Sequence, residues 1–326
     1  MFRASNDGTV RRWDIAPLPM QQLVDLPGPA KAAALAPNGQ YVAVGFDSGA
    51  VRLYTLPDMR LVGEQEKAHS SDVKRLSFNA AGTLLASASH DKTAKLWAVA
   101  PDGTLTAQQT FSGHTGSVHA LAFSPDGTLL ATASYDGRIG LFTVGTEEQR
   151  FIDAHGGNVA SVAFDASGSR LLSAGIDDKI VRLWNLSTDP PTPLQAFPPA
   201  QDQRLWASLS PDGHTMASVG RSLVVDVYAT RDARLLHRLV GHEQAVFRAI
   251  FSPDSQQLAT VSGDTTLRLW DLGSSGELFS LRLPTHRNPP VPLWDFDLRC
   301  TPTGCWIAVP LTRGKLALYD FGRIDE

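Results

Sequence analysis

The chain has 326 residues, of which 43% are hydrophobic and 19% are charged, and its formal net charge is −4. This composition is typical of a globular protein with a large core, and the absence of a basic excess argues against a general binder of nucleic acid or of anionic membranes. The sequence has no run of about 18 apolar residues that could cross a membrane and no signal-peptide core. We therefore expect a cytoplasmic protein.

Short strands that end in an aromatic residue recur along the chain at intervals of 41 to 49 residues. Between these endings, short runs rich in β-branched and aromatic residues alternate with period two, and turn sequences such as Pro-Asp-Gly separate them. This pattern predicts a repeated unit of four antiparallel strands, with no helix of useful length. The eight aromatic endings are Trp13, Tyr54, Trp97, Phe142, Trp184, Tyr228, Trp270 and Tyr319.

The first and last units of the chain are incomplete. The unit that ends at Tyr319 lacks a fourth strand, and residues 20–26 (MQQLVDL) form a strand without inner strands of its own. We expect this strand to join the last unit, so that residues 20–326 close into a ring without a free edge. Residues 1–19 are then a partial repeat, a surplus hairpin or a remnant of an upstream repeat. This predicts a fragment of a longer protein, and an eighth unit remains an alternative.

A histidine, an aspartate and an aromatic residue recur in four units, with the same spacing in three of them and one inserted residue in the unit of His155. His114, Ser134 and Asp136 in isolation resemble a hydrolytic triad, but a triad is needed only once per active site, whereas this set repeats. We therefore expect structural hydrogen-bond networks, in which a Ser or Thr (Ser87 or Ser89, Thr132 or Ser134) links the histidine to an indole N–H. The members are His69, Asp91 and Trp97; His114, Asp136 and Phe142; His155, Asp178 and Trp184; and His242, Asp264 and Trp270.

Some units depart from this pattern. Phe142 has no N–H to donate, and the units that end at Tyr54, Tyr228 and Tyr319 lack the histidine. Complete sets are therefore expected on alternating units, with less firmly held units between them.

The pattern resembles the WD40-repeat family, whose repeats have a period of about 40–45 residues and run from Gly-His to Trp-Asp. Gly-His occurs at 113–114 and 241–242, and Trp-Asp at 13–14 and 270–271. The resemblance covers essentially the whole chain. It implies an all-β fold, a seven-bladed β-propeller of four-stranded antiparallel blades, with the His–Ser/Thr–Asp–Trp sets as structural tetrads.

The sequence offers little that suggests catalysis. It contains no phosphate-binding loop, no nucleophile elbow and no H-x-x-x-H or C-x-x-C pattern, so we expect no catalytic residues, no metal and no cofactor. Cys300 and Cys305 are interpreted as ordinary reduced thiols. An enzyme with a site at the central channel of the propeller is the alternative.

The resemblance instead implies binding of a protein or peptide on the narrow face of the propeller, near the channel. The expected contact residues lie three and five positions after the blade histidine and just before the turn aspartate. We expect a non-catalytic scaffold, a regulatory or sensor module that is part of a larger protein or complex, with no nucleic acid or membrane partner. The candidate partner-binding residues are Asp72, Lys74, His90, Ser117, His119, Tyr135, Asn158, Asp177 and Phe247.

Overall fold

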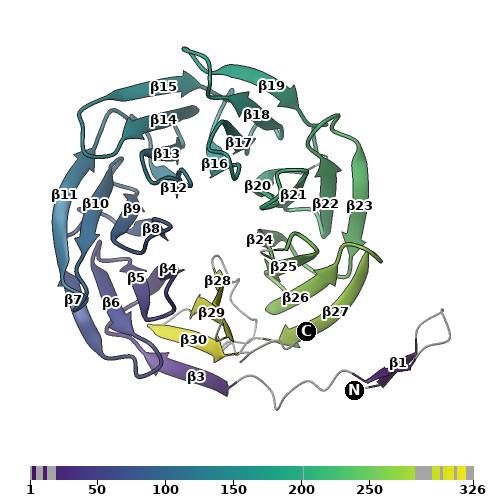
Figure 1. Ribbon diagram of the computed structural model, residues 1–326, viewed down its shortest axis with the longest axis horizontal. Coiled ribbons are helices and arrows are strands. Elements are labelled where there is room, and N and C mark those ends of the chain that lie inside the picture. Colours follow the sequence, from purple (N-terminus) through teal and green to yellow (C-terminus); the bar gives the residue numbers. More distant parts are fainter. Residues whose placement is uncertain are drawn as a thin grey trace.

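A computed structural model of the chain describes residues 2–4, 10–12, 20–200, 202–252, 254–282, 296–301, 304–311 and 314–320. Within these ranges the chain folds into seven four-stranded antiparallel sheets arranged as a ring around a central opening (Figure 1). The prediction of a seven-bladed, all-β propeller is confirmed. The described residues form no helix, and accordingly none that is long and apolar enough to span a membrane.

We number the blades 1 to 7 from the sheet that begins at Ala30, and each blade is given from its inner to its outer strand. Blades 1 to 3 consist of β4 (Ala30–Leu35), β5 (Tyr41–Phe46), β6 (Val51–Thr55) and β7 (Leu61–Gln65); β8 (Val73–Phe78), β9 (Leu84–Ser89), β10 (Ala94–Val99) and β11 (Leu105–Phe111); and β12 (Val118–Phe123), β13 (Leu129–Ser134), β14 (Arg138–Thr143) and β15 (Gln149–Asp153).

Blades 4 to 6 follow in the same order around the ring. They consist of β16 (Val159–Phe164), β17 (Arg170–Gly175), β18 (Val181–Asn185) and β19 (Thr192–Ala196); β20 (Arg204–Leu209), β21 (Thr215–Gly220), β22 (Val224–Ala229) and β23 (Leu235–Val240); and β24 (Val246–Phe251), β25 (Gln257–Ser262), β26 (Thr266–Asp271) and β27 (Gly276–Arg282).

Blade 7 joins the two ends of the ring. Its first three strands are β28 (Asp297–Thr301), β29 (Gly304–Leu311) and β30 (Lys315–Asp320), and its outer strand is β3 (Met20–Asp25). β3 pairs with β30 along its whole length, from Met20 opposite Asp320 to Asp25 opposite Lys315. Because this pairing joins the two ends of the chain in one sheet, blade 7 reaches four strands and β30 has a neighbour on both sides.

Residues 1–19 contribute only β1 (Phe2–Ala4) and β2 (Val10–Arg12) to the described structure, and these two strands pair antiparallel with each other. The rest of the predicted partial repeat, including Trp13, lies outside the described residues.

The hydrophobic core lies between neighbouring blades. Leu85 of blade 2 packs with Leu53 of blade 1 in one cluster, and Phe142 of blade 3 packs with Leu96 of blade 2 in another. The middle strands are almost fully buried, because both of their faces are covered by adjacent blades. This explains why their sequences are nearly continuous runs of small and apolar residues rather than strict alternations.

A β-bulge interrupts the ladder near the start of the inner strand in blades 1 to 6. In blade 2, for example, Val73 pairs with Ser89 but the next pair is Arg75 with Ala88, so that Lys74 is skipped. A bulge of this kind bends the strand and re-aims one side chain. The skipped residues are Lys31, Lys74, His119, Ala160, Leu205 and Phe247.

Candidate functional site

The loop before each inner strand and the turn after each middle strand lie at the same edge of the blade, because the two strands are antiparallel. In blade 2 this brings His69, which precedes β8, to Asp91, which follows β9, with 2.9 Å between His69 Nδ1 and the carboxylate. The turn of the preceding blade holds this loop, since the His69 N–H donates to the Gly49 carbonyl oxygen. Gly49 has a φ of +85°, and a Cβ there would lie 2.2 Å from the His69 oxygen, so only glycine fits.

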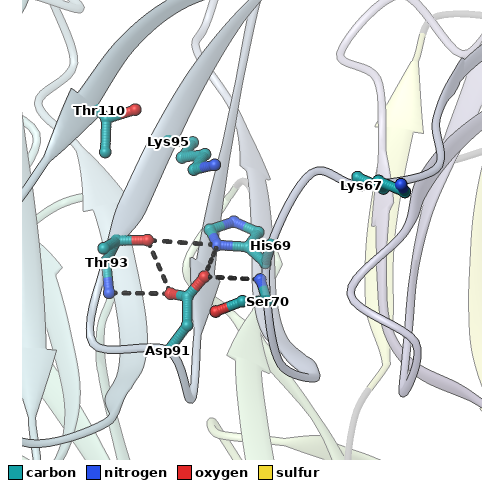
Figure 2. Close-up of a pocket in the computed structure, with 7 residues that line it drawn as sticks. All are labelled: Lys67, His69, Ser70, Asp91, Thr93, Lys95 and Thr110. Carbon is teal, nitrogen blue, oxygen red and sulfur yellow. Dashed lines mark hydrogen bonds and ion pairs between the residues drawn. The ribbon is translucent and has the colours of Figure 1, made fainter.

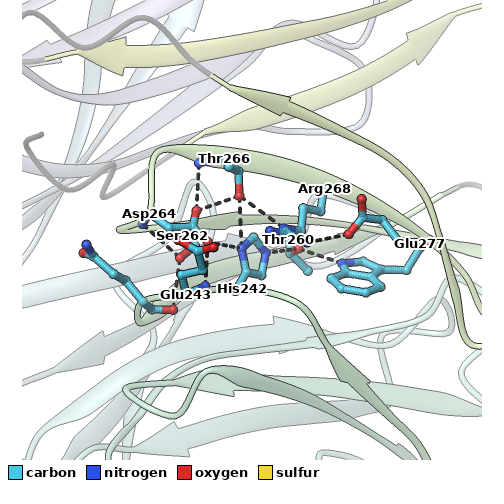
Figure 3. Close-up of polar contacts among 10 residues, drawn as sticks. His242, Glu243, Thr260, Ser262, Asp264, Thr266, Arg268 and Glu277 are labelled. Carbon is cyan, nitrogen blue, oxygen red and sulfur yellow. Dashed lines mark hydrogen bonds and ion pairs between the residues drawn. The ribbon is translucent and has the colours of Figure 1, made fainter.

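Three blades contain complete chains of hydrogen bonds. In blade 6 the indole Nε1 of Trp270 lies 2.8 Å from Thr260 Oγ1, which lies 2.7 Å from His242 Nε2. His242 Nδ1 in turn lies 2.9 Å from Asp264 (Figure 3). The equivalent sets are Trp97, Ser87, His69 and Asp91 in blade 2, and Trp184, Ser173, His155 and Asp178 in blade 4.

The hydrogen bonds in the sets of blades 2 and 6 run in one direction when the imidazole is neutral. Nδ1–H donates to the aspartate, Nε2 accepts the hydroxyl proton, and the hydroxyl oxygen accepts the indole N–H. The pKa values of His114 and His155 agree with this state, because burial lowers both and outweighs the neighbouring aspartates.

The middle strands of blades 2 and 3 each carry a second hydroxyl with a different role. Ser87 and Thr132 join the histidine, whereas Ser89 and Ser134 accept a hydrogen bond from the backbone N–H of the turn aspartate. The alternatives left open by the sequence are therefore resolved in favour of Ser87 and Thr132. Ser87 is fully buried and its oxygen already accepts an indole N–H, so a substrate cannot reach it.

Blade 3 has the histidine and the aspartate but not the indole. His114 lies 2.7 Å from Thr132 and 2.9 Å from Asp136, while Phe142 stands in place of the tryptophan. Phe142 packs edge-on against Phe151, whose ring also meets the edge of the His114 imidazole. An aromatic cluster thus replaces the missing hydrogen bond.

The candidate partner-binding residues of blades 3 and 4 form one connected group. The rings of His119 and Tyr135 are stacked with centroids 4.8 Å apart and planes 15° apart. His119 Nδ1 lies 3.3 Å from the Ala160 carbonyl oxygen of blade 4. Asp177 fixes the adjacent loop by accepting the Asn158 backbone N–H at 2.8 Å. Burial raises the pKa of Tyr135, and the negative charge of Asp177 adds to this.

The candidates of blade 2 form a second group. Lys74 Nζ lies 2.6 Å from Asp72, and His90, whose side chain is 60% exposed, lies 4.0 Å from the same carboxylate. Burial opposes ionisation of Asp72, but the Lys74 ammonium and other contacts outweigh it, so the pKa of Asp72 lies below its usual value.

Two further candidates stand apart. Ser117 is 7% exposed, and its hydroxyl has no hydrogen-bond partner among the described residues. Phe247 is half-buried on blade 6, beside the turn glycine Gly263, two blades away from Asp177. The structure therefore brings together the candidates of blades 2, 3 and 4 as neighbouring groups and leaves Phe247 separate.

The sequence interpretation missed a cluster in the central channel. Trp206 of blade 5 is 8% exposed, and the guanidinium groups of Arg75 and Arg248 lie over its ring, 4.4 and 5.0 Å from the centroid. A signal was available, since both arginines stand six residues after a blade histidine and Trp206 is a tryptophan within an inner strand. Among the described residues, no group of three or more His, Cys, Asp or Glu side chains is arranged to hold a metal ion.

The repeats also match a known protein family. The family described as "WD domain, G-beta repeat" matches residues 62–98, 105–143, 146–185 and 233–271, which together with the tetrads and the seven blades decides the assignment. The chain belongs to the WD40-repeat family.

Curated proteins with similar sequences include two whose names contain the words "WD repeat-containing protein". The WD40 chain is 49% identical over 49 residues to a Notchless protein homolog of Arabidopsis thaliana (15% of this chain, 10% of the relative) and 42% identical over 71 residues to human Striatin-4 (22% and 9%). It is 26% identical over 250 residues to rat apoptotic protease-activating factor 1 (77% and 16%). The WD40 chain thus spans roughly a tenth to a sixth of the length of these relatives.

Proposed function

We propose that this WD40 propeller is a non-catalytic scaffold that binds a protein or peptide at the face carrying the histidine loops, with blades 2 to 4 as the main contact surface. The observation that carries the proposal is the His119–Tyr135 stack. Tyr135 is 36% exposed, and few large hydrophobic side chains among the described residues are exposed to this extent. Aromatic residues held in a fixed orientation are typical anchors of protein interfaces.

The β-bulges support the same surface. Lys74 and His119 are the skipped residues of their inner strands, and a bulge is a device that re-aims a side chain. The negative charge of Asp177 acts on Tyr135 of the aromatic stack, and blade 2 adds the ion pair of Asp72 and Lys74. This mixture of aromatic and charged groups is common where a protein partner is recognised.

The tetrads favour a scaffold over an enzyme. The side chains that resemble a hydrolytic triad are buried, hydrogen-bonded and repeated, so they stabilise blades. The proposal includes a cytoplasmic location and a role as a regulatory or sensor module within a larger protein or complex, since the matched segments cover only 10% and 9% of the Notchless protein homolog and of Striatin-4.

Affinity capture from the native cells tests the proposal. The wild-type chain is compared with Tyr135→Ala, Phe247→Ala and the control Leu194→Ala, which changes an exposed side chain on the outer strand β19. We expect Tyr135→Ala to lose a specific protein that the wild type and the control retain, with little change in the melting temperature of any variant. If all four chains capture the same proteins equally, the proposed face is wrong.

A further inference from the structure

A groove of about 490 Å³ lies beside the tetrad of blade 2 (Figure 2). Lys67, in the loop before β8, lines one side, and Lys95 and Thr110, on the neighbouring strands β10 and β11, line another. Ser70 and Thr110 are exposed, and no hydrogen bond of their hydroxyl groups is formed within the described part of the chain. The groove therefore presents two ammonium groups and two available hydroxyl donors.

The single carboxylate that lines this groove is already engaged. Asp91 accepts hydrogen bonds from the backbone N–H groups of Ser70 and Thr93, from the Thr93 hydroxyl and from His69. Figure 2 shows these four contacts converging on the carboxylate. With its oxygens occupied in this way and its side chain only 9% exposed, Asp91 forms no ion pair with either lysine. Neither Lys67 nor Lys95 forms an ion pair within the ranges that the structure describes.

The corresponding position in other blades shows that this lack of neutralisation is particular to blade 2. Lys95 stands two residues before the aromatic ending of its blade's third strand, and three other blades have an arginine at this position. Each of those arginines contacts an acidic side chain of its own blade. The pairs are Arg52 with Glu64 and Glu66, Arg182 with Asp178, and Arg268 with Glu277. In blade 2 the residue opposite Lys95 is Thr110, whose side chain carries a hydroxyl and no charge.

We propose that this groove binds an oxyanion carried by a peptide, namely the phosphate of a phosphoserine or phosphothreonine in a protein partner. A phosphoryl group carries a charge of about −1.5 to −2 at neutral pH and three acceptor oxygens, and the two lysines that line the groove without an ion pair supply the opposite charge. An extended nucleic acid does not fit, because only two cations line the groove and the chain as a whole carries a charge of −4. The inference deepens the proposed function by naming the chemistry of one partner residue, and it rests on that function only for the source of the phosphate.

The test uses defined probes and residue-resolved amide shifts of the full chain. The probes are a short Gly/Ala peptide with one central phosphoserine, the same peptide with serine or with glutamate, and inorganic phosphate. We expect the phosphopeptide to shift the amides of residues 67–70 and 91–95, and the serine peptide to shift none. The Lys67→Gln/Lys95→Gln variant should bind the phosphopeptide at least fivefold more weakly than the wild type. Lys92→Gln, which changes an exposed lysine of the same blade, should bind it with unchanged affinity.

Each other outcome overturns part or all of the proposal. Absence of shifts at these amides, or binding that the double variant retains, overturns the site. If the glutamate peptide binds equally well, the ligand group is a carboxylate and not specifically a phosphate. If inorganic phosphate binds equally well, the ligand is the free ion and not a peptide. Tyr135→Ala should leave phosphopeptide binding intact, so a failure of the groove is distinguishable from a failure of the proposed partner face.

Discussion

Arg75 stacks on Trp206 across the centre of the propeller, with 4.4 Å between the guanidinium carbon and the ring centroid. Arg75 belongs to β8 of blade 2 and Trp206 to β20 of blade 5, and blades 3 and 4 lie between them in the ring (Figure 1). The contact must therefore pass through the central opening. Arg248 of blade 6 lies over the same indole, so one ring ties together three blades that are not held by a shared sheet.

Trp206→Ala should destabilise the propeller by about 3 kcal/mol or more, since removing a buried tryptophan leaves a cavity and removes two cation–π contacts of about 0.5–2 kcal/mol each. Trp206→Phe should cost clearly less, because it retains an aromatic face and the indole N–H has no hydrogen-bond partner among the described residues. Urea unfolding of both variants measures the difference. Equal stability of Trp206→Ala and the wild type would show that the channel contact contributes nothing.

Thr260→Val and Thr132→Val form a matched test of the tetrads. Thr260 connects His242 and Trp270, whereas Thr132 connects only to His114 in its set, because Phe142 has no donor. Each buried polar group left without a partner costs about 1–3 kcal/mol, so Thr260→Val should lower the free energy of unfolding by about 1–2 kcal/mol more than Thr132→Val. Denaturant titration gives both values. Equal losses would mean that the indole hydrogen bond adds no stability.

The repeat explains how much of the fold could be predicted from the sequence. Seven of the eight aromatic strand endings each mark one blade, and the spacing of 22 residues from His69 to Asp91 predicts a contact that the structure places at 2.9 Å. These features depend on local chain geometry, which is the same in every repeat. Their recurrence is what separates a structural network from a single active site.

Contacts between distant blades could not be predicted in the same way. The Arg75–Trp206 stack joins residues 131 positions apart, 75 to 206, and depends on the width of the opening, which no local pattern specifies. The β-bulge that skips His119 depends on how the inner strand twists. The unneutralised charge of Lys95 becomes visible only when the side-chain contacts of other blades are known.

Mild acid should weaken the fold through the buried histidines. Burial lowers the pKa of His114 and His155 below the ordinary value of 6.5, so the unfolded chain binds protons more readily than the folded chain. The free energy of unfolding should therefore be highest above about pH 6.5 and fall as the pH drops from there through the lower folded-state pKa values. The slope should approach about 1.4 kcal/mol per pH unit for each histidine.

The histidine effect can be isolated with one variant and one control. His155→Gln should reduce the pH dependence of the unfolding free energy between pH 7.5 and 5.5, although it also lowers stability at both values. His214→Gln, which changes an exposed histidine, should leave the slope as in the wild type. If the slope is unchanged in His155→Gln, the buried histidine does not cause the pH dependence of the unfolding free energy.

Backbone amides of blades 5 and 7 should exchange with deuterium faster than those of blades 2, 4 and 6. Blade 5 has no tetrad, and its Asp226 instead contacts Arg238, whose side chain is 55% exposed; an exposed ion pair of this kind contributes little. In blade 7 the buried hydroxyl of Tyr319 has no hydrogen-bond partner within the described ranges. Local opening begins where the contacts are least firmly held, so peptide-resolved exchange should be slowest in the blades with complete tetrads. Uniform protection around the ring would show that the tetrads do not set local stability.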